Sequence, residues 1–108
     1  MSPTFPPAPV IELDDGVEEL LRRQGTDAVT VELTLDFEGA ELKQAVAFPG
    51  AGEPSLGFQR VRVRSVDVWW RQRVVLASAE PRVVTRPRPR KLVIGRLGRA
   101  LTAHASYS

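Results

Sequence analysis

The chain has 108 residues, enough for one domain with a modest hydrophobic core. It contains no cysteine and one histidine, His104, which excludes disulfides, thiolate metal sites and a histidine-built zinc site. Its net charge of +2 conceals an asymmetry: residues 1–57 hold eleven acidic and three basic residues, net −8, whereas residues 58–108 hold two acidic and twelve basic residues, net +10. Opposed halves are expected when a chain pairs with itself, with a copy of itself, or with a polyanion.

Neither a secretory signal nor a membrane span is expected. Residues 1–9 lack the basic segment and apolar run of a signal peptide, and no segment approaches the roughly 18 apolar residues of a span. We therefore expect a cytoplasmic or virion protein without membrane contact. Prolines at positions 3, 6, 7 and 9 favour an extended, polyproline-like conformation, so residues 1–9 are predicted to form an N-terminal arm.

Residues 10–85 are predicted to form a globular domain that contains one short helix, over about residues 16–24. Asp15 and Glu18 have the spacing of a capping box, and Gly25 is typical of a helix end. The apolar residues within this segment fall on one helical face: Val17, Leu20 and Leu21.

A β-hairpin is predicted after the helix. From Ala28 to Phe37 the odd positions are apolar and the even positions polar, which is typical of a half-buried antiparallel strand. After a turn at residues 38–40 the pattern resumes, with side chains predicted to face inward at Leu42, Val46 and Phe48. Prolines and glycines in residues 49–54 predict a surface loop.

A third strand is predicted from about Phe58 to Arg73. Its apolar positions shift from odd to even near Arg64-Ser65, and a one-residue β-bulge is the simplest device that produces this shift. Trp70 then faces the core and Trp69 faces outward. The predicted outward face holds Arg60, Arg62, Arg64, Asp67, Trp69, Arg71 and Arg73.

The remaining chain contains two short apolar runs, 74–77 and 82–85, with a turn at Glu80-Pro81 between them. Residues 86–91 are predicted to be an extended basic linker, and residues 92–108 a C-terminal element and tail in which 92–101 is either strand or helix. The basic side chains of the linker are Arg86, Arg88, Arg90 and Lys91. The expected fold class is α+β and β-dominant, with the helix against a twisted antiparallel sheet of about four to six strands that can close into a small barrel.

The arginine-rich strand face is the main candidate for binding. Arginines on one face beside Trp69 can contact phosphates and stack on a base, and the linker can follow a phosphate backbone. Alternatively, the acidic row containing Glu32 and Asp36 pairs with the arginines across neighbouring strands.

The segment Ile94-Gly95-Arg96-Leu97-Gly98-Arg99-Ala100-Leu101 resembles the I-G-x-x-G-x-x-I signature of KH domains. In that family a glycine loop between two helices clamps a nucleic-acid backbone, and the matching residues here are Gly95 and Gly98. The alternative is that both glycines mark turns or close packing.

No catalytic, metal or cofactor constellation is visible, so neither an enzyme nor a cofactor is expected. His104 lies in a small-residue tail expected to lack rigidity, and neither Ser65 nor Ser78 has a nucleophile motif. The favoured function is a structural subunit of a protein complex, most concretely a phage connector or tail-type particle, which forms a homo-oligomer or contacts other subunits through its opposed halves and arms. The alternative is a small nucleic-acid-binding β module; an enzyme using scattered carboxylates ranks third.

Overall fold

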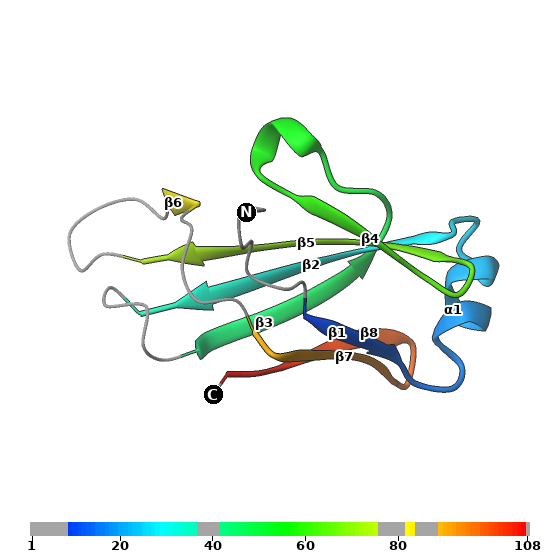
Figure 1. The fold of residues 1–108 in the computed structure, drawn as a ribbon. Helices are drawn as coiled ribbons and strands as arrows, with labels where there is room; N and C mark the ends of the chain where they lie inside the picture. The colour runs from blue at the N-terminus through cyan, green and yellow to red at the C-terminus, as the bar shows by residue number, and fades with distance from the viewer. Residues whose placement is uncertain (1–8, 37–41, 76–81, 84–88, 108) are drawn as a thin grey trace, which may run out of the picture.

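The computed structural model describes residues 9–36, 42–75, 82–83 and 89–107, which form two β-sheets and one helix (Figure 1). The smaller sheet has the order β1-β7-β8, with β1 at Val10–Leu13, β7 at Lys91–Leu97 and β8 at Ala100–Ser106. The larger sheet has the order β3-β2-β5-β4, with β2 at Ala28–Leu35, β3 at Leu42–Pro49, β4 at Gln59–Val63 and β5 at Val66–Val74; β6 (Arg82–Val83) also pairs with β5. The predicted β-dominant fold with one helix is confirmed.

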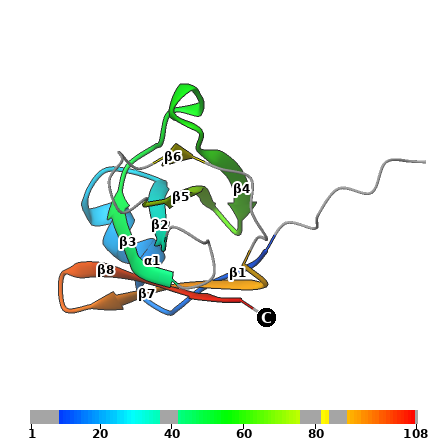
Figure 2. The ribbon, with the colours of Figure 1, turned by 90° about the vertical axis from the view of Figure 1, so that its left-hand side faces the viewer.

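The sequence predicted antiparallel strands, but two of the strand pairs are parallel. Strand β2 runs parallel to β5, and β1 runs parallel to β7. Alternating apolar residues fix which face of a strand is buried but carry no information about the direction of its neighbours. The sheets lie across one core, with β3 beside β8 at one side, and do not close into a barrel (Figure 2).

Helix α1 (Val17–Arg23) lies at one end of the sheets and buries its apolar face in the core, as predicted (Figure 1). The predicted capping box is wrong: Gly16 is the N-cap, with φ 91°, and no side chain caps the helix. The C-terminal end follows the prediction, because the amide of Gly25 donates to the carbonyl of Arg22 and that of Thr26 to the carbonyl of Leu21. No helix among the described residues is long and apolar enough to cross a membrane.

The β2–β3 hairpin is confirmed, and of the three side chains predicted to face inward on its second strand Leu42 packs against the core, after a register shift, whereas Val46 and Phe48 face outward. The register between the two strands determines which side chains of β3 face the core, because cross-strand partners share a face. Buried Val31 of β2 lies opposite Ala47, and buried Leu33 lies opposite Ala45. The alanines therefore pack against the core, and Val46 and Phe48 are exposed. Strand β2 is also more buried than expected, because it is central in its sheet and even Thr30 is covered. Phe37 and the turn at residues 38–40 lie outside the described residues.

The predicted β-bulge at Arg64-Ser65 is instead the two-residue turn of a hairpin. Strands β4 and β5 are antiparallel, with Val63 opposite Val66, and Arg64 has φ 55°. A turn of two residues changes the inward parity as a one-residue insertion would, so the apolar pattern cannot distinguish the two. The predicted inward Trp70 is buried at 2% exposure, and Trp69 lies on the opposite face.

The C-terminal residues form a hairpin inside the same core and not a flexible tail. Segment 92–101, left open between strand and helix, spans β7 and the start of β8, and β8 continues through His104 to Ser106. Of the predicted linker, Arg90 lies directly before β7 and its amide donates to the Ser106 carbonyl. Lys91 is the first residue of β7 and pairs with Glu12. The rest of the predicted arm and linker, residues 1–8 and 84–88 with Arg86 and Arg88, lies outside the described residues.

Tyr107 fastens the end of β8 to the larger sheet, because its hydroxyl donates to Oε1 of Gln72 at 3.1 Å. Burial raises the pKa of Tyr107 from 10.0 to about 12. The folded state therefore holds this proton more tightly, and the resulting stability is present below pH 10 and lost as pH rises toward 12.

We predict that Tyr107→Phe flattens the fall in unfolding midpoint between pH 10 and pH 12, because the variant has no phenol to ionise. Denaturation by urea at steps of half a pH unit measures this, and absorbance titration reads the pKa directly because Tyr107 is the only tyrosine. A phenol that titrates near its ordinary value in the folded protein would contradict the prediction.

Candidate functional site

The candidate site is the outer face, defined as the face of the β3-β2-β5-β4 sheet turned away from the smaller sheet. Register places two kinds of side chain there, since partners on neighbouring strands share a face. Strand β3 contributes apolar side chains, while β2, β5 and β4 contribute mainly charged ones. The outer face contains Thr30, Glu32, Val46, Phe48, Arg60, Arg62, Asp67, Trp69, Arg71 and Arg73.

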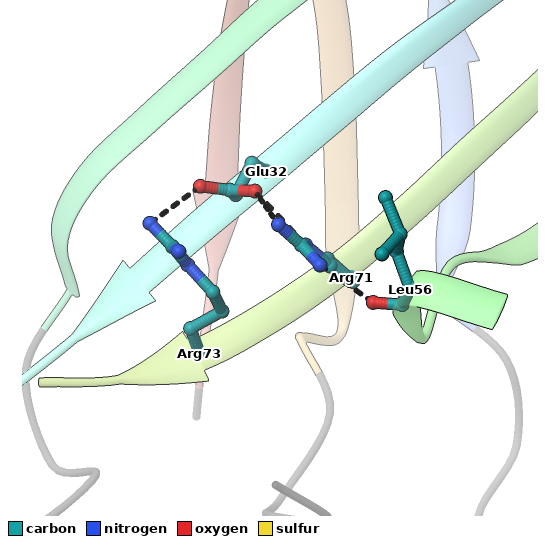
Figure 3. A network of polar contacts seen from close by, with 4 residues as sticks. All are labelled: Glu32, Leu56, Arg71 and Arg73. Atoms are coloured by element: carbon teal, nitrogen blue, oxygen red, sulfur yellow. Dashed lines mark hydrogen bonds and ion pairs between the residues drawn. The ribbon is translucent and has the colours of Figure 1, made fainter. Parts of the chain in front are cut away.

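An ion-pair network centred on Glu32 occupies the middle of the outer face (Figure 3). Oε2 of Glu32 accepts from Nε and Nη2 of Arg71 at 2.9 and 2.6 Å, and Oε1 lies 2.7 Å from Nη2 of Arg73. The exposed side-chain fractions are 17% for Glu32, 15% for Arg71 and 28% for Arg73. Charge-assisted pairs in such a poorly exposed position are stronger than exposed pairs because water screens them less.

Arg71 also holds the segment that joins β3 to β4. This segment crosses the outer face because β2 and β5 lie between those two strands, and it contains the 3-10 turn η1 (Pro54–Leu56). Nη1 of Arg71 donates to the carbonyl of Leu56 (Figure 3). The Arg71 guanidinium also lies 4.4 Å from the Phe58 ring centroid. Every nitrogen of the Arg71 side chain therefore has an acceptor within the chain.

A pocket of about 330 Å³ lies between the crossing segment and the sheet. Its apolar wall includes Phe48 and Leu56, which are 47% and 51% exposed, large values for side chains of this size. Such exposed apolar groups around a hollow are typical of binding surfaces. The pocket is lined by Thr30, Glu32, Phe48, Ala51, Gly52, Glu53, Leu56, Phe58 and Arg71.

The other predicted arginines are distributed differently. Nη1 of Arg62 lies 3.0 Å from Oδ1 of Asp67, and the Arg60 guanidinium lies 5.6 Å from the Trp69 ring centroid. Arg64 is in the turn and binds Glu18 of α1 at 3.2 Å. Hydrogen bonds from Ser65 and then Arg64 lower the pKa of Glu18.

The acidic residues proposed to pair with the arginines are placed as follows. Glu32 binds Arg71 and Arg73, so that part of the cross-strand pairing is present. Asp36 is half-buried just after β2. Gly95 and Gly98, which matched the KH signature, lie in β7 and in the β7–β8 turn, so the helices that flank a KH loop are replaced by strands. Gly95 is close-packed, since a Cβ there would lie 2.8 Å from Oδ2 of Asp14.

Sequence reasoning missed the apolar half of the site. Phe48 was assigned inward, and Leu56 and Phe58 were given no role. The available signal was the alternation of Ala45 and Ala47 with Val46 and Phe48, which allows either face to be buried. Only the cross-strand register shows that the smaller side chains are inside.

No catalytic arrangement is formed by the described residues. His104 is exposed on β8 opposite Val93, and the Ser65 hydroxyl donates to Glu18. Within the described part of the chain there is no cluster of three or more potential metal-ligating side chains. A second pocket, of about 430 Å³, lies between α1 and the β4–β5 turn and is lined by charged residues that include Glu18 and Arg62.

Comparisons with models of protein families, with curated proteins and with solved structures found no match to this chain.

We predict that Glu32→Gln lowers the free energy of unfolding by about 2–3 kcal/mol, because it leaves Arg71 and Arg73 partly buried without a carboxylate. The matched control is Glu19→Gln, which breaks the exposed pair with Arg23 on α1 and should cost no more than about 0.5 kcal/mol. Urea denaturation measures both. Equal losses in the two variants would show that the network contributes no more than a surface pair.

We also predict that Gly52→Ala displaces the crossing segment, since the added Cβ would lie 2.9 Å from Cγ of Phe58 and 3.0 Å from Cβ of Trp69. The control is Ala51→Ser, which adds one atom at the neighbouring exposed position. Amide hydrogen exchange of residues 52–58 should accelerate in the first variant only. Unchanged exchange in Gly52→Ala would contradict the tight packing.

Proposed function

We propose that this protein is a non-enzymatic structural subunit of a larger protein assembly, and that the outer face makes the subunit contact. The observation that carries the proposal is that the outer face holds both internally paired arginines and exposed apolar side chains. The arginines at its centre are neutralised within the chain, while apolar side chains remain exposed around a pocket. A phage connector or tail-type particle is the most concrete form of such an assembly.

The internal pairing argues for a protein partner. All three nitrogens of the Arg71 side chain already donate to Glu32 or Leu56, so turning this guanidinium toward a phosphate would disturb three contacts in a poorly exposed position. Desolvated charge pairs resist such exchange because removing one partner leaves a buried charge. The central arginines are therefore better suited to shaping the pocket than to contacting a polyanion.

The exposed apolar group argues in the same direction. Val46 and Phe48 lie two residues apart on β3, and Leu56 lines the same pocket as Phe48. Aromatic and aliphatic side chains inserted into small pockets dominate the energy of protein interfaces, and arginine at the margin supports them.

The charge halves of the sequence support the assembly less directly than expected. Each sheet joins strands of both halves, which meet at the β2–β5 pair and at the β1–β7 pair. Glu12, Glu18 and Glu32 of the first half bind Lys91, Arg64, Arg71 and Arg73 of the second. The asymmetry is thus partly satisfied within one chain. The contact surface in this proposal is the outer-face pocket and not an acidic half against a basic half.

A nucleic-acid-binding module is the second candidate, favoured by one observation. Arg62 and Arg64 have 58% exposed side chains, and their surface ion pairs are of the kind worth at most about 1 kcal/mol. They can therefore exchange a carboxylate for a phosphate at little cost, and Arg60 over Trp69 can accompany a stacked base.

We expect light scattering to give a mass above one chain, and Phe48→Thr to reduce association at least tenfold because it removes the largest exposed ring of the pocket. Threonine suits a strand, so the fold is retained. The control is Val75→Thr, at an exposed apolar position outside the pocket. A single-chain mass at all concentrations would refute the assembly proposal.

The same measurement with a short single-stranded oligonucleotide, at two salt concentrations, separates the candidates. An oligomer that ignores the oligonucleotide favours assembly. A single chain that binds the oligonucleotide, with affinity falling log-linearly with salt and a smaller slope in the Arg62→Gln, Arg64→Gln variant, favours nucleic-acid binding.

A further inference from the structure

The outer-face pocket suits an uncharged, apolar chain segment. Phe48, Leu56 and Phe58 form its apolar wall, and each nitrogen of the Arg71 side chain already donates to Glu32 or to the Leu56 carbonyl. Grooves lined by aromatic rings bind polyproline II segments, because such a segment is extended before binding and loses little conformational entropy. The volume of about 330 Å³ is near the small end for a ligand pocket and fits one or two side chains.

The chain itself contains a segment of this chemistry. Residues 1–9 (MSPTFPPAP) carry no charged side chain, and Pro3, Pro6 and Pro9 recur at intervals of three. A polyproline II helix has three residues per turn, so in that conformation Pro3 and Pro6 lie on one side. Pro9, directly before β1, is buried within its own chain, so the segment that can reach a partner is residues 1–8. Phe5 adds the single aromatic ring of the segment.

The geometry favours a second copy as the acceptor. Residues 1–8 precede β1, which belongs to the smaller sheet, and the two sheets lie on opposite sides of the core (Figure 2). The pocket is lined by residues on the face of the larger sheet that is turned away from this core. To enter its own pocket the segment would have to bend around a sheet edge, and proline-rich segments are semi-rigid. At about 3.1 Å per residue, eight residues extend about 25 Å, enough to enter a neighbouring subunit.

We propose that residues 1–8 of one copy bind in the outer-face pocket of a second copy, with the Phe5 ring between Phe48 and Leu56. This inference rests on the proposed function and specifies the contact that builds the assembly. Because donor and acceptor surfaces differ, the contact is head-to-tail, and repetition closes a ring or extends a filament. Each contact is small, and a closed ring strengthens it through effective concentration.

The absence of cysteine permits a direct test by disulfide trapping in the full-length chain. One preparation carries Ser2→Cys, beside the proposed contact residues; the other carries Ser55→Cys, in the exposed turn at the pocket rim. After mixing and mild oxidation, more than half of the chains should form the mixed dimer on a non-reducing gel. Adding Phe5→Ala to the Ser2→Cys chain should lower that yield at least fivefold, and Thr4→Ala should leave it unchanged.

The control acceptor is Gln24→Cys, which is exposed at the end of α1 and away from the pocket. A yield no higher than with this control, from a protein that light scattering shows to be oligomeric, overturns the arm contact and leaves the proposed function standing. A single-chain mass overturns the proposed function as well. A cross-linked single chain from the double variant Ser2→Cys, Ser55→Cys at high dilution assigns the arm to its own pocket and overturns the second-copy contact.

Discussion

The carboxylate of Glu32 is the interaction on which the outer face depends. It lies on the central strand β2, and both of its oxygens bind arginines of the neighbouring parallel strand β5. Two guanidiniums two residues apart on one strand face would otherwise repel each other at close range. Once Glu32 orients Arg71, the remaining nitrogen of that guanidinium reaches the Leu56 carbonyl, so a charge pair in the sheet also fixes the backbone of the crossing segment. The pocket exists because that segment is held at a set height above the strands.

The strand order explains why acidic and basic halves of the sequence come together. Strands β2 and β3 belong to the acidic half and β4 and β5 to the basic half, and the parallel β2–β5 pair joins the two in one sheet. The same order forces the β3–β4 connection to pass over two strands. The parallel β2–β5 pair, which neutralises the arginines, and the β3–β4 connection, which covers the pocket, are thus consequences of one topology.

Local patterns predicted the individual elements well and their arrangement poorly. The helix, the β2–β3 hairpin and the opposite orientations of Trp69 and Trp70 follow from periodicity, because burial acts residue by residue along a strand or helix. Two predictions were wrong because two different structures give the same sequence pattern. The hairpin turn at Arg64-Ser65 shifts the apolar positions just as a β-bulge would. In β3, the alternation of Ala45 and Ala47 with larger apolar residues does not show which face is buried. The arginines and Glu32 were found from their spacing, but the apolar half of the site required the register between strands, which is a non-local property.

The pairing of β1 with β7 has a consequence for how the chain reaches this structure. Val10 lies beside Lys91, about 80 residues later in the sequence, so this strand pair forms through a contact of very long sequence separation. Leu92 and Ile94 of β7 supply fully buried parts of the core, which therefore depends on the same long-range contact. Folding is expected to be slow for a chain of this size, because closing such a long loop costs entropy before the β7–β8 hairpin can hold β1 in place.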